Sequence, residues 1–253
     1  MDFIGKRILI TGSSRGIGRA AAEAFLERGA HVAINGRNPD TVAAAVSSLD
    51  AGDRLVPVVG DIGSAGACAT LVATALDSLG GLDILVNSAG VAHATSIEDS
   101  DEAVWDETLD TNLKGTFFTS RAALAALRTS GGNIVNLASD AGLIGEAGLS
   151  VYCASKGGVV NMTKALALEL APKVRVNCVC PGYVDTDMVR RDFIEKAEDP
   201  SVEEQEIIDY APLKRMASPE EIAYAIVYLA SDMARNITGA ALQIDGGSTA
   251  GHP

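Results

Sequence analysis

Short runs rich in β-branched residues alternate with alanine-rich helical patterns along almost the whole chain of 253 residues. This alternation is typical of repeated βαβ units, which build a parallel sheet. It predicts strands at residues 7–10, 31–35, 55–59, 83–87, 133–137, 174–179 and 241–244. It predicts helices at residues 17–28, 39–49, 65–79, 110–128, 151–170 and 219–230. The predicted strands are nearly continuous apolar runs, which indicates that helices cover both faces of the sheet.

The pattern therefore favours an α/β fold, a Rossmann-type doubly wound parallel sheet of about seven strands. No linker and no block of charge divides residues 1–253, so we expect a single domain. Residues 182–215 break the rhythm, because they are polar and acidic with short helical patterns at 186–195 and 202–210. A long insertion between a strand and the next helix is more often a lid than a plain connection. We expect a helical substrate lid here.

Charge and cysteine usage exclude several classes of partner. The chain has 20 basic and 33 acidic residues, a net charge of −13, which argues against a nucleic-acid or anionic-membrane surface. No apolar stretch approaches bilayer length, and no leader precedes the first strand. Cys68, Cys153, Cys178 and Cys180 have no histidine at ligand spacing, so we expect reduced thiols and no metal site. A cytoplasmic protein follows.

A glycine-rich loop follows the first predicted strand. It reads Thr11-Gly12-Ser13-Ser14-Arg15-Gly16-Ile17-Gly18, and a helix is predicted directly after it. Glycines let the backbone approach a pyrophosphate, and a helix N-terminus offers it free N–H groups and partial positive charge. The spacing differs from the usual GxGxxG, and a plain tight turn is the alternative. We favour a dinucleotide site.

The end of the second predicted strand bears on the choice of nicotinamide cofactor. Its sequence, Ile34-Asn35-Gly36-Arg37-Asn38, lacks the acid that would bind both ribose hydroxyls of NAD. Arg37, with Arg15 across from it, could instead make forked contacts with a 2′-phosphate. The alternative is that both arginines are merely solvated. We expect NADP(H), with NAD(H) as the second choice.

Three polar residues with acid/base chemistry follow the fifth predicted strand. Tyr152 and Lys156 are spaced i, i+4 at the start of a helical pattern, so both side chains share one face. A neighbouring ammonium lowers the pKa of a tyrosine and makes it a plausible acid/base. Ser139 could bring its hydroxyl to the same carbonyl oxygen. Asn112, polar among apolar neighbours, could bridge to Lys156 or be a buried side-chain cap.

These features occur together in a recognisable order: Thr11-Gly12-x-x-x-Gly16-x-Gly18, Asn87-Ser88-Ala89-Gly90, Asn112, Ser139, Tyr152-x-x-x-Lys156 and Pro181-Gly182. The chain resembles the short-chain dehydrogenase/reductase superfamily, in its shorter single-domain branch. The resemblance implies hydride transfer between a nicotinamide and a carbonyl or secondary alcohol. Tyr152 would be the general acid/base and Ser139 would hold the substrate oxygen. Lys156 would bind the ribose and lower the pKa of Tyr152, and Asn112 would hold a relay water.

The same resemblance implies the other cofactor contacts and the assembly. The implied cofactor-binding residues are Gly12, Ser14, Arg15, Gly16, Ile17, Gly18, Arg37, Asp61, Ile62, Asn87, Ala89, Gly90, Tyr152, Lys156, Pro181, Gly182, Val184 and Thr186. The resemblance implies a homotetramer and does not imply a metal. Ser88 departs from the family pattern, which commonly has a second Asn there, so details of that loop stay open.

The substrate is only loosely constrained. Residues 91–96, 140–149 and the lid should wall it, and their small aliphatic character with two acids favours a small or medium alcohol or ketone over a strongly anionic one. His93 and Glu146 could orient substrate hydroxyls, but solvent exposure is equally expected, so neither is assigned a role. His252 lies in a tail that we expect to be mobile.

Several functions stay open within and beyond this family. The chain is similar to 3-oxoacyl-carrier-protein reductases and to sugar-acid or polyol dehydrogenases, although the single Arg128 offers little to an acidic carrier. A non-catalytic dinucleotide-binding regulator is the alternative from another class, and it has no need of a Ser, Tyr and Lys in working register. An extended-type epimerase would need a larger C-terminal domain. An enzyme is favoured.

Overall fold

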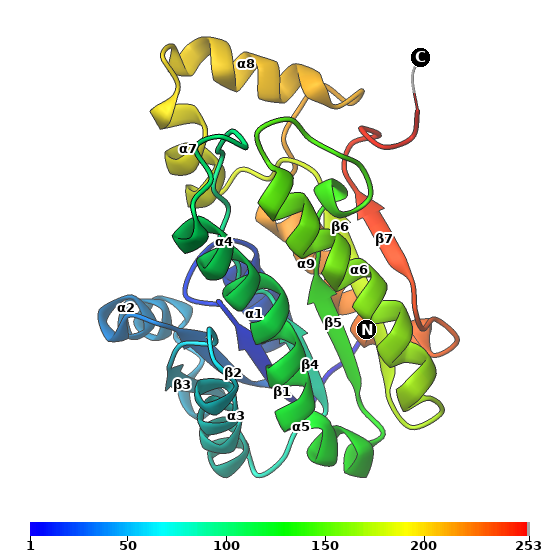
Figure 1. Ribbon diagram of the computed structural model, residues 1–253. Coiled ribbons are helices and arrows are strands. Elements are labelled where there is room, and N and C mark those ends of the chain that lie inside the picture. Colours follow the sequence, from blue (N-terminus) through cyan, green and yellow to red (C-terminus); the bar gives the residue numbers. More distant parts are fainter. Residues whose placement is uncertain (252–253) are drawn as a thin grey trace.

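Parallel strands form one seven-stranded sheet in the order β3-β2-β1-β4-β5-β6-β7 (Figure 1). The computed structural model describes residues 1–251, and His252, in the tail expected to be mobile, lies outside the described residues. The strands are β1 Arg7–Thr11, β2 His31–Gly36, β3 Leu55–Val59, β4 Ile84–Asn87, β5 Asn133–Leu137, β6 Arg175–Pro181 and β7 Ala241–Ile244. The predicted doubly wound sheet is confirmed, with strand ends shifted by two residues at most.

The central strand shows why these runs are apolar throughout. Ile8, Leu9 and Ile10 of β1 are fully buried. Ile8 and Ile10 pack into the core on one face, whereas Leu9 packs into the core on the other. Side chains alternate across a strand, so a strand covered on both faces needs apolar residues at every position.

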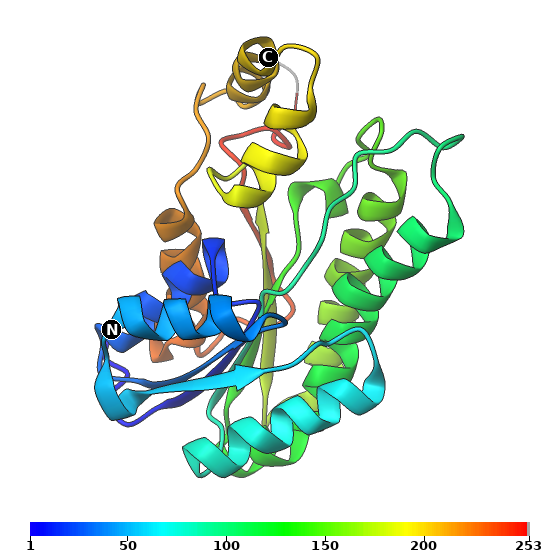
Figure 2. The same ribbon diagram turned by 90° about the vertical axis from the view of Figure 1, so that its left-hand side faces the viewer.

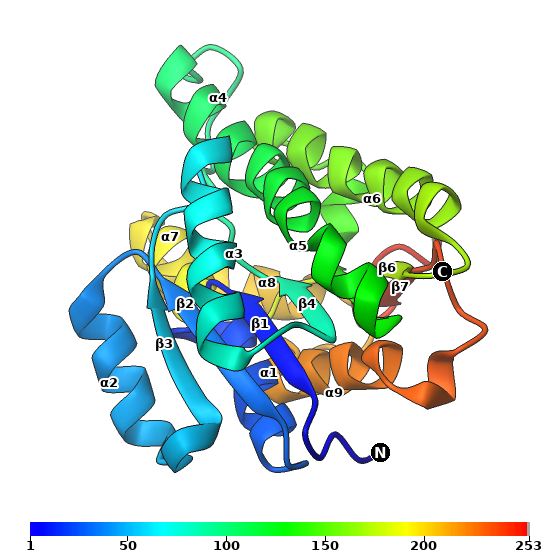
Figure 3. The ribbon, with the colours of Figure 1, turned by 90° about the horizontal axis from the view of Figure 1, so that it is seen from below.

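Two helical layers cover the sheet, as the view from below shows (Figure 3). One layer contains α1, α2 and α9, and the other contains α3, α5 and α6. The longer helices are α1 Gly16–Leu26, α2 Pro39–Leu49, α3 Ala65–Leu79, α4 Glu102–Leu109, α5 Thr116–Ser130, α6 Ser150–Leu170, α8 Pro200–Tyr210 and α9 Pro219–Ala230. None of the helices described for residues 1–251 combines the length and apolarity needed to cross a membrane.

The helix predicted at residues 110–128 is present, but it begins with a π-helical turn, and the helix before it was not predicted. The chain forms α4, then a π-helical turn at Asp110–Gly115, and only then α5. The pattern missed α4 because Thr108 is its single buried residue, so it has no apolar stripe. Asp101 begins it by accepting a hydrogen bond from the N–H of Val104. The π turn contains Asn112, which bears on the site below.

The strand order reverses between β1 and β4. From β1 the chain winds outward through β2 to β3, and from β4 it winds the other way to β7. The loops that follow β1 and β4 therefore part at the carboxyl edge, where ligands of such sheets bind. Figure 2 shows α7 (Asp187–Asp192) and α8 standing beyond this edge. These helices share a small core of their own, Val189, Ile194 and Ile207.

Candidate active site

A cavity of about 450 Å³ opens at the carboxyl edge of the sheet. Its wall is built from the loops after β1, β2, β3, β4, β5 and β6 and from the start of α6. Every residue that the sequence assigns to catalysis or cofactor binding lines this cavity, apart from Asn87 and Asn112. The fold thus gathers residues that are more than 170 positions apart, from Gly12 to Thr186.

The glycine loop packs tightly against the loop after β4. Gly12 has a φ of +62°, and a Cβ there would lie 2.5 Å from the Ala89 Cα. Only glycine satisfies both constraints. Helix α1 then starts at Gly16 with no side-chain cap and no acidic residue in its first turn. Its N–H groups are therefore available to an anion, and this end of the cavity fits the pyrophosphate of a dinucleotide.

Asn35 supports the glycine loop from below, a role that the sequence did not reveal. Its side chain is almost fully buried and donates to the carbonyls of Val58 and Gly60, at 3.0 and 2.9 Å. It also accepts a hydrogen bond from the N–H of Gly12 at 3.2 Å. Asn35 therefore connects β2 to the loops after β1 and β3.

Replacing Asn35 with Ala is expected to lower the free energy of unfolding by about 3 kcal/mol, because it leaves three backbone groups without a partner. The midpoint of thermal unfolding should fall by roughly 6–12 °C. Calorimetry checks this, with Asn38→Ala as the control: Asn38 caps the exposed start of α2, and its loss should cost about 1 kcal/mol. Equal effects of the two substitutions would contradict the supporting role.

Arg15 lies in the loop after β1, and Arg37 directly follows β2. Both line the cavity, and the Arg37 side chain is 59% exposed. The nearest carboxylate to Arg37 is Glu107 of α4, with Nη1 and Oε1 3.9 Å apart. Glu107 also pairs with His93 at 3.1 Å. His93 is thus engaged outside the cavity, and the Arg37 guanidinium stays largely open to a ligand.

Asp61 and Ile62, just after β3, form the next part of the wall. The Asp61 carboxylate accepts a hydrogen bond from the N–H of Ile62 at 2.8 Å, while the side chain of Ile62 is buried. Across the cavity Thr186 starts α7, and its methyl group would lie 3.6 Å from a Cβ at Gly16. The residues after β6 therefore face the glycine loop.

Tyr152, Ser139 and Lys156 meet at the centre of the cavity. Ser139 lies in the loop after β5, where it caps a 3-10 turn, and Tyr152 and Lys156 lie on the first turns of α6. The Lys156 ammonium donates to the Leu137 carbonyl at 2.8 Å and lies 5.7 Å from the centre of the Tyr152 ring. All three residues line the cavity, with both Ser139 and Lys156 near Tyr152, as predicted.

The pKa values of this pair follow from burial. Burial raises the pKa of Tyr152 above its ordinary value, and the nearby Ser139 hydroxyl lowers it by less. The pKa of Tyr152 is thus shifted upward, opposite to the lowering that was expected from Lys156. Burial also lowers the pKa of Lys156 to about 8. Tyr152 is therefore a neutral phenol at neutral pH, whereas Lys156 is still mostly protonated.

Asn112 is brought beside the cavity by the π turn. Its side chain exchanges two hydrogen bonds of 2.9 Å with the backbone N–H and carbonyl of Val91. It also donates to the Ser155 hydroxyl at 3.0 Å. Both polar atoms of the side chain are thus engaged, and the bridge to Lys156 considered from the sequence is not formed. The side chain fixes the loop after β4 to α6.

Asn87 ends β4 and is not among the residues that line the cavity, so its predicted contact with the cofactor stays a prediction. Its amide donates to the Ser120 hydroxyl at 3.0 Å and to the side chain of Asn136 at 2.9 Å. Asn87 and Asn136 face each other in the register of β4 and β5, so their side chains meet between the strands. Residues 88–90 carry the chain into the wall instead.

The substrate end of the cavity lies between the loops and α7. Part of each predicted wall lines the cavity: residues 91 and 92, loop residues 140, 146 and 149, and lid residues 182–184, 186–189 and 193. Residues 200–215 do not line the cavity.

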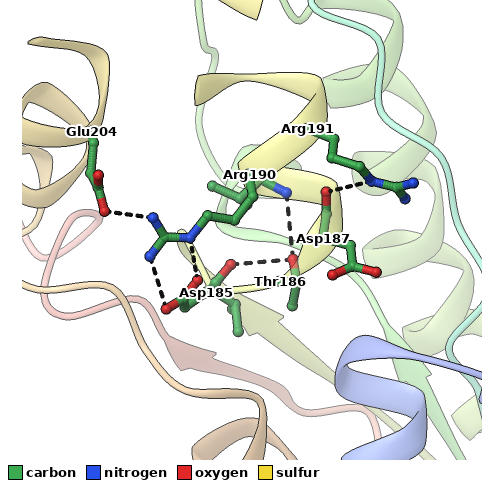
Figure 4. A network of polar contacts seen from close by, with 8 residues as sticks. Asp185, Thr186, Asp187, Arg190, Arg191 and Glu204 are labelled. Atoms are coloured by element: carbon green, nitrogen blue, oxygen red, sulfur yellow. Dashed lines mark hydrogen bonds and ion pairs between the residues drawn. The ribbon is translucent and has the colours of Figure 1, made fainter. Parts of the chain in front are cut away.

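Arg190 of α7 joins the lid residues to α8, because it pairs with Asp185 at 2.7 Å and with Glu204 at 2.6 Å (Figure 4). Among residues 1–251, no three potential ligands gather in a metal-binding arrangement.

Comparisons with known proteins agree over the whole chain. A family model described as "Enoyl-(Acyl carrier protein) reductase" matches residues 12–249. The chain is 39% identical to 2-(S)-hydroxypropyl-CoM dehydrogenase 3 of Xanthobacter autotrophicus, over 96% of each sequence. It is 37% identical to the NADP-dependent (R)-specific alcohol dehydrogenase of Lentilactobacillus kefiri, over 97% of each. A crystal structure described as that of a "putative short-chain alcohol dehydrogenase" from Sinorhizobium meliloti 1021 matches with a TM-score of 0.90 and 38% identity, covering 99% of both chains.

Proposed function

Since this chain belongs to the short-chain dehydrogenase/reductase family and is an NAD(P)-dependent oxidoreductase, we propose that it uses NADP(H) to interconvert a ketone and a secondary alcohol. The observation that carries the proposal is the meeting of Ser139, Tyr152 and Lys156 in one cavity with the glycine loop. A regulatory protein that only bound the dinucleotide would not need these three side chains together.

Ser139 and Tyr152 act on the oxygen of the substrate carbonyl. When bound, NADPH supplies the hydride that reduces the carbonyl carbon. Ser139 donates a hydrogen bond to the carbonyl oxygen and holds it beside Tyr152. Tyr152 gives this oxygen its proton, which suits a phenol whose pKa is raised by burial. In the oxidation direction Tyr152 takes the proton back.

Lys156 and Asn112 act around this centre. The Lys156 ammonium, already directed at the Leu137 carbonyl, holds the ribose of the cofactor and favours the phenolate of Tyr152 electrostatically. Asn112 fixes the loop at Val91 through two hydrogen bonds. The relay water that the family resemblance implies would be held by the same segment. The glycine loop and the N-terminus of α1 hold the pyrophosphate, and residues 182–186 meet the nicotinamide end.

NADP(H) is proposed over NAD(H) because two arginines, Arg15 and Arg37, line the cavity. Arg37 is exposed there, and among residues 1–251 its one ion pair is the 3.9 Å contact with Glu107. A 2′-phosphate carries more charge than this distant carboxylate and offers forked contacts to the guanidinium. The absence of an acid at the end of β2 removes the usual contact to the ribose hydroxyls of NAD.

A cytoplasmic location and a homotetramer are also proposed. The four cysteines are free thiols, as a reducing compartment favours. Large apolar side chains of the helices beside the sheet are exposed, Leu168 of α6 by 84% and Phe117 of α5 by 39%. Copies of the chain that pair through these helices would cover them. Light scattering at micromolar concentration should give four times the 26.0 kDa of one chain, and a monomeric mass would contradict the assembly.

The proposed activity is tested by following nicotinamide absorbance with NADPH, and separately with NADH, across ketones of different classes. The panel contains diketones, cyclic ketones, keto-sugar acids and an acetoacetyl thioester. Turnover with NADPH is expected for at least one class, and the best member gives the substrate class. Binding of NADPH without turnover of any member would favour the regulatory alternative.

A further inference from the structure

A carboxylate and a phenol meet in the substrate half of the cavity. Glu146 lies in the loop between Ser139 and Tyr152, and Tyr183 follows β6. Both line the cavity, and the Tyr183 hydroxyl donates to Glu146 Oε1 at 2.7 Å. The second oxygen, Oε2, makes no hydrogen bond with any residue of the described range 1–251. Glu146 therefore keeps an acceptor for a ligand.

The position of Tyr183 is fixed by aromatic neighbours. Its ring meets Phe193 and Tyr210 edge-on, with ring centres 6.2 and 5.6 Å apart. Such contacts stabilise one orientation of the ring. The hydroxyl of Tyr183 is thereby held toward Glu146, and Glu146 is in turn oriented inside the cavity.

The remaining charges around this point are unfavourable to an anion. Asp140 also lines the cavity, but its two oxygens already accept hydrogen bonds from the N–H of Ala141 and the hydroxyl of Ser248. Among the described residues, the cationic side chains of the wall are Arg15, Arg37 and Lys156. The two arginines follow β1 and β2, and Lys156 is directed at a backbone carbonyl. Leu149, Met188 and Phe193 supply apolar walls.

We propose that Glu146, oriented by Tyr183, determines substrate specificity by accepting a hydrogen bond from a hydroxyl or a protonated amine carried by the substrate. The preferred substrate is then a ketone or secondary alcohol with such a donor, and one with a carboxylate in that place is rejected. This inference rests on the proposed function, because it concerns the end of the substrate that lies away from the carbonyl group that meets Tyr152.

Proximity and burial support this assignment. Glu146 and Tyr152 line the same cavity, so one small molecule can contact both residues. The charge of Glu146 also contributes to the raised pKa of Tyr152. Burial raises the pKa of Glu146 itself, whereas the Tyr183 hydroxyl lowers it. A half-buried carboxylate with one free oxygen gains from a donor and repels a second carboxylate.

The test compares four ketones that share the reacting carbonyl and chain length but end in methyl, hydroxyl, ammonium or carboxylate. For each, kcat/KM with NADPH is measured in the unchanged protein, in Glu146→Gln and in Glu195→Gln. Glutamine keeps the size of Glu146 and an oxygen for Tyr183, but presents an N–H donor where Oε2 was. Glu195, exposed in the turn after α7 and away from the cavity wall, is the control for loss of one charge.

In the unchanged protein and in Glu195→Gln, kcat/KM for the hydroxyl or ammonium ketone should be about tenfold higher than for the methyl ketone. For the carboxylate ketone it should be about tenfold lower than for the methyl ketone. Glu146→Gln should abolish the preference for a donor and raise the rate with the carboxylate. Whichever of the hydroxyl and ammonium ketones has the higher kcat/KM identifies the donor that Glu146 prefers. Shifts of the melting temperature by the same ketones, with NADPH present, give a second readout that needs no turnover.

Two failures are distinguishable. The methyl ketone can be turned over while the protein shows no preference among the end groups, or a preference that is unchanged in Glu146→Gln. Either result overturns the role of Glu146 and leaves the proposed function intact. Absence of turnover for all four contradicts the proposed function for this substrate class. In that case melting shifts that favour neither donor also overturn the inference, whereas donor-specific shifts lost in Glu146→Gln support it.

Discussion

Tyr152→Phe is expected to lower kcat on the order of 10³-fold, the contribution typical of a positioned general acid. The substitution removes the one hydroxyl that gives a proton to the substrate oxygen and keeps the ring that packs under Lys156. The dissociation constant of NADPH should change by only about twofold, because the phosphate contacts and the contact of Lys156 with the ribose are kept. Steady-state kinetics and NADPH titration measure the two effects separately.

Tyr224→Phe is the matched control, since Tyr224 is exposed on α9 and lies outside the cavity wall. It should leave both constants unchanged. If Tyr152→Phe kept full turnover on a verified substrate, the assignment of Tyr152 as acid/base would be wrong. A loss of turnover that came with an equal loss of NADPH affinity would indicate a structural role instead.

Arg37→Asp is expected to shift the ratio of NADPH to NADH efficiency by about 10²-fold toward NADH. A charge-assisted hydrogen bond contributes about 1.5–3 kcal/mol, and each 1.4 kcal/mol is a factor of ten. The new carboxylate would also repel the 2′-phosphate and could bind the ribose hydroxyls of NADH. The ratio of kcat/KM values for the two cofactors, on one substrate, is the measurement.

Glu107→Gln separates phosphate binding from a surface ion pair. Glu107 is the carboxylate beside Arg37, at 3.9 Å. If Arg37 binds phosphate, removing this competing charge should leave NADPH affinity unchanged or improve it, while Arg37→Asp weakens it. A cofactor ratio that stays constant in both variants would mean that Arg37 is only a solvated surface residue.

The fold and most of the cavity wall were predictable because their signals are local. A strand buried on both faces must be apolar throughout, as Ile8, Leu9 and Ile10 are, so its position can be found in the sequence. Glycines at positions of positive φ, such as Gly12 and Gly16, carry an equally local signal. Parallel strands then bring their carboxyl ends to one edge, which places Ser139 and Tyr152 beside the glycine loop.

The parts that escaped prediction depend on contacts between distant residues. Asn35 and Asn87 are both asparagines at strand ends, yet one supports the glycine loop and the other pairs with Asn136. Only the packing of neighbouring strands distinguishes them. Likewise, nothing near Glu146 in the sequence indicates Tyr183 as its partner, 37 residues away. Helix α4 was missed because a helix with an exposed surface lacks the apolar period.

The most direct test of the central claim follows the transferred hydrogen itself. NADPH labelled with deuterium on the transferable position of nicotinamide C4 is incubated with the enzyme and its best ketone, and the alcohol is analysed by mass spectrometry and NMR. We predict one deuterium per product molecule, on the carbinol carbon, and no product in Tyr152→Phe within the same time. Alcohol formed without deuterium at that carbon, or at the same rate in Tyr152→Phe, would contradict hydride transfer with Tyr152 as the acid.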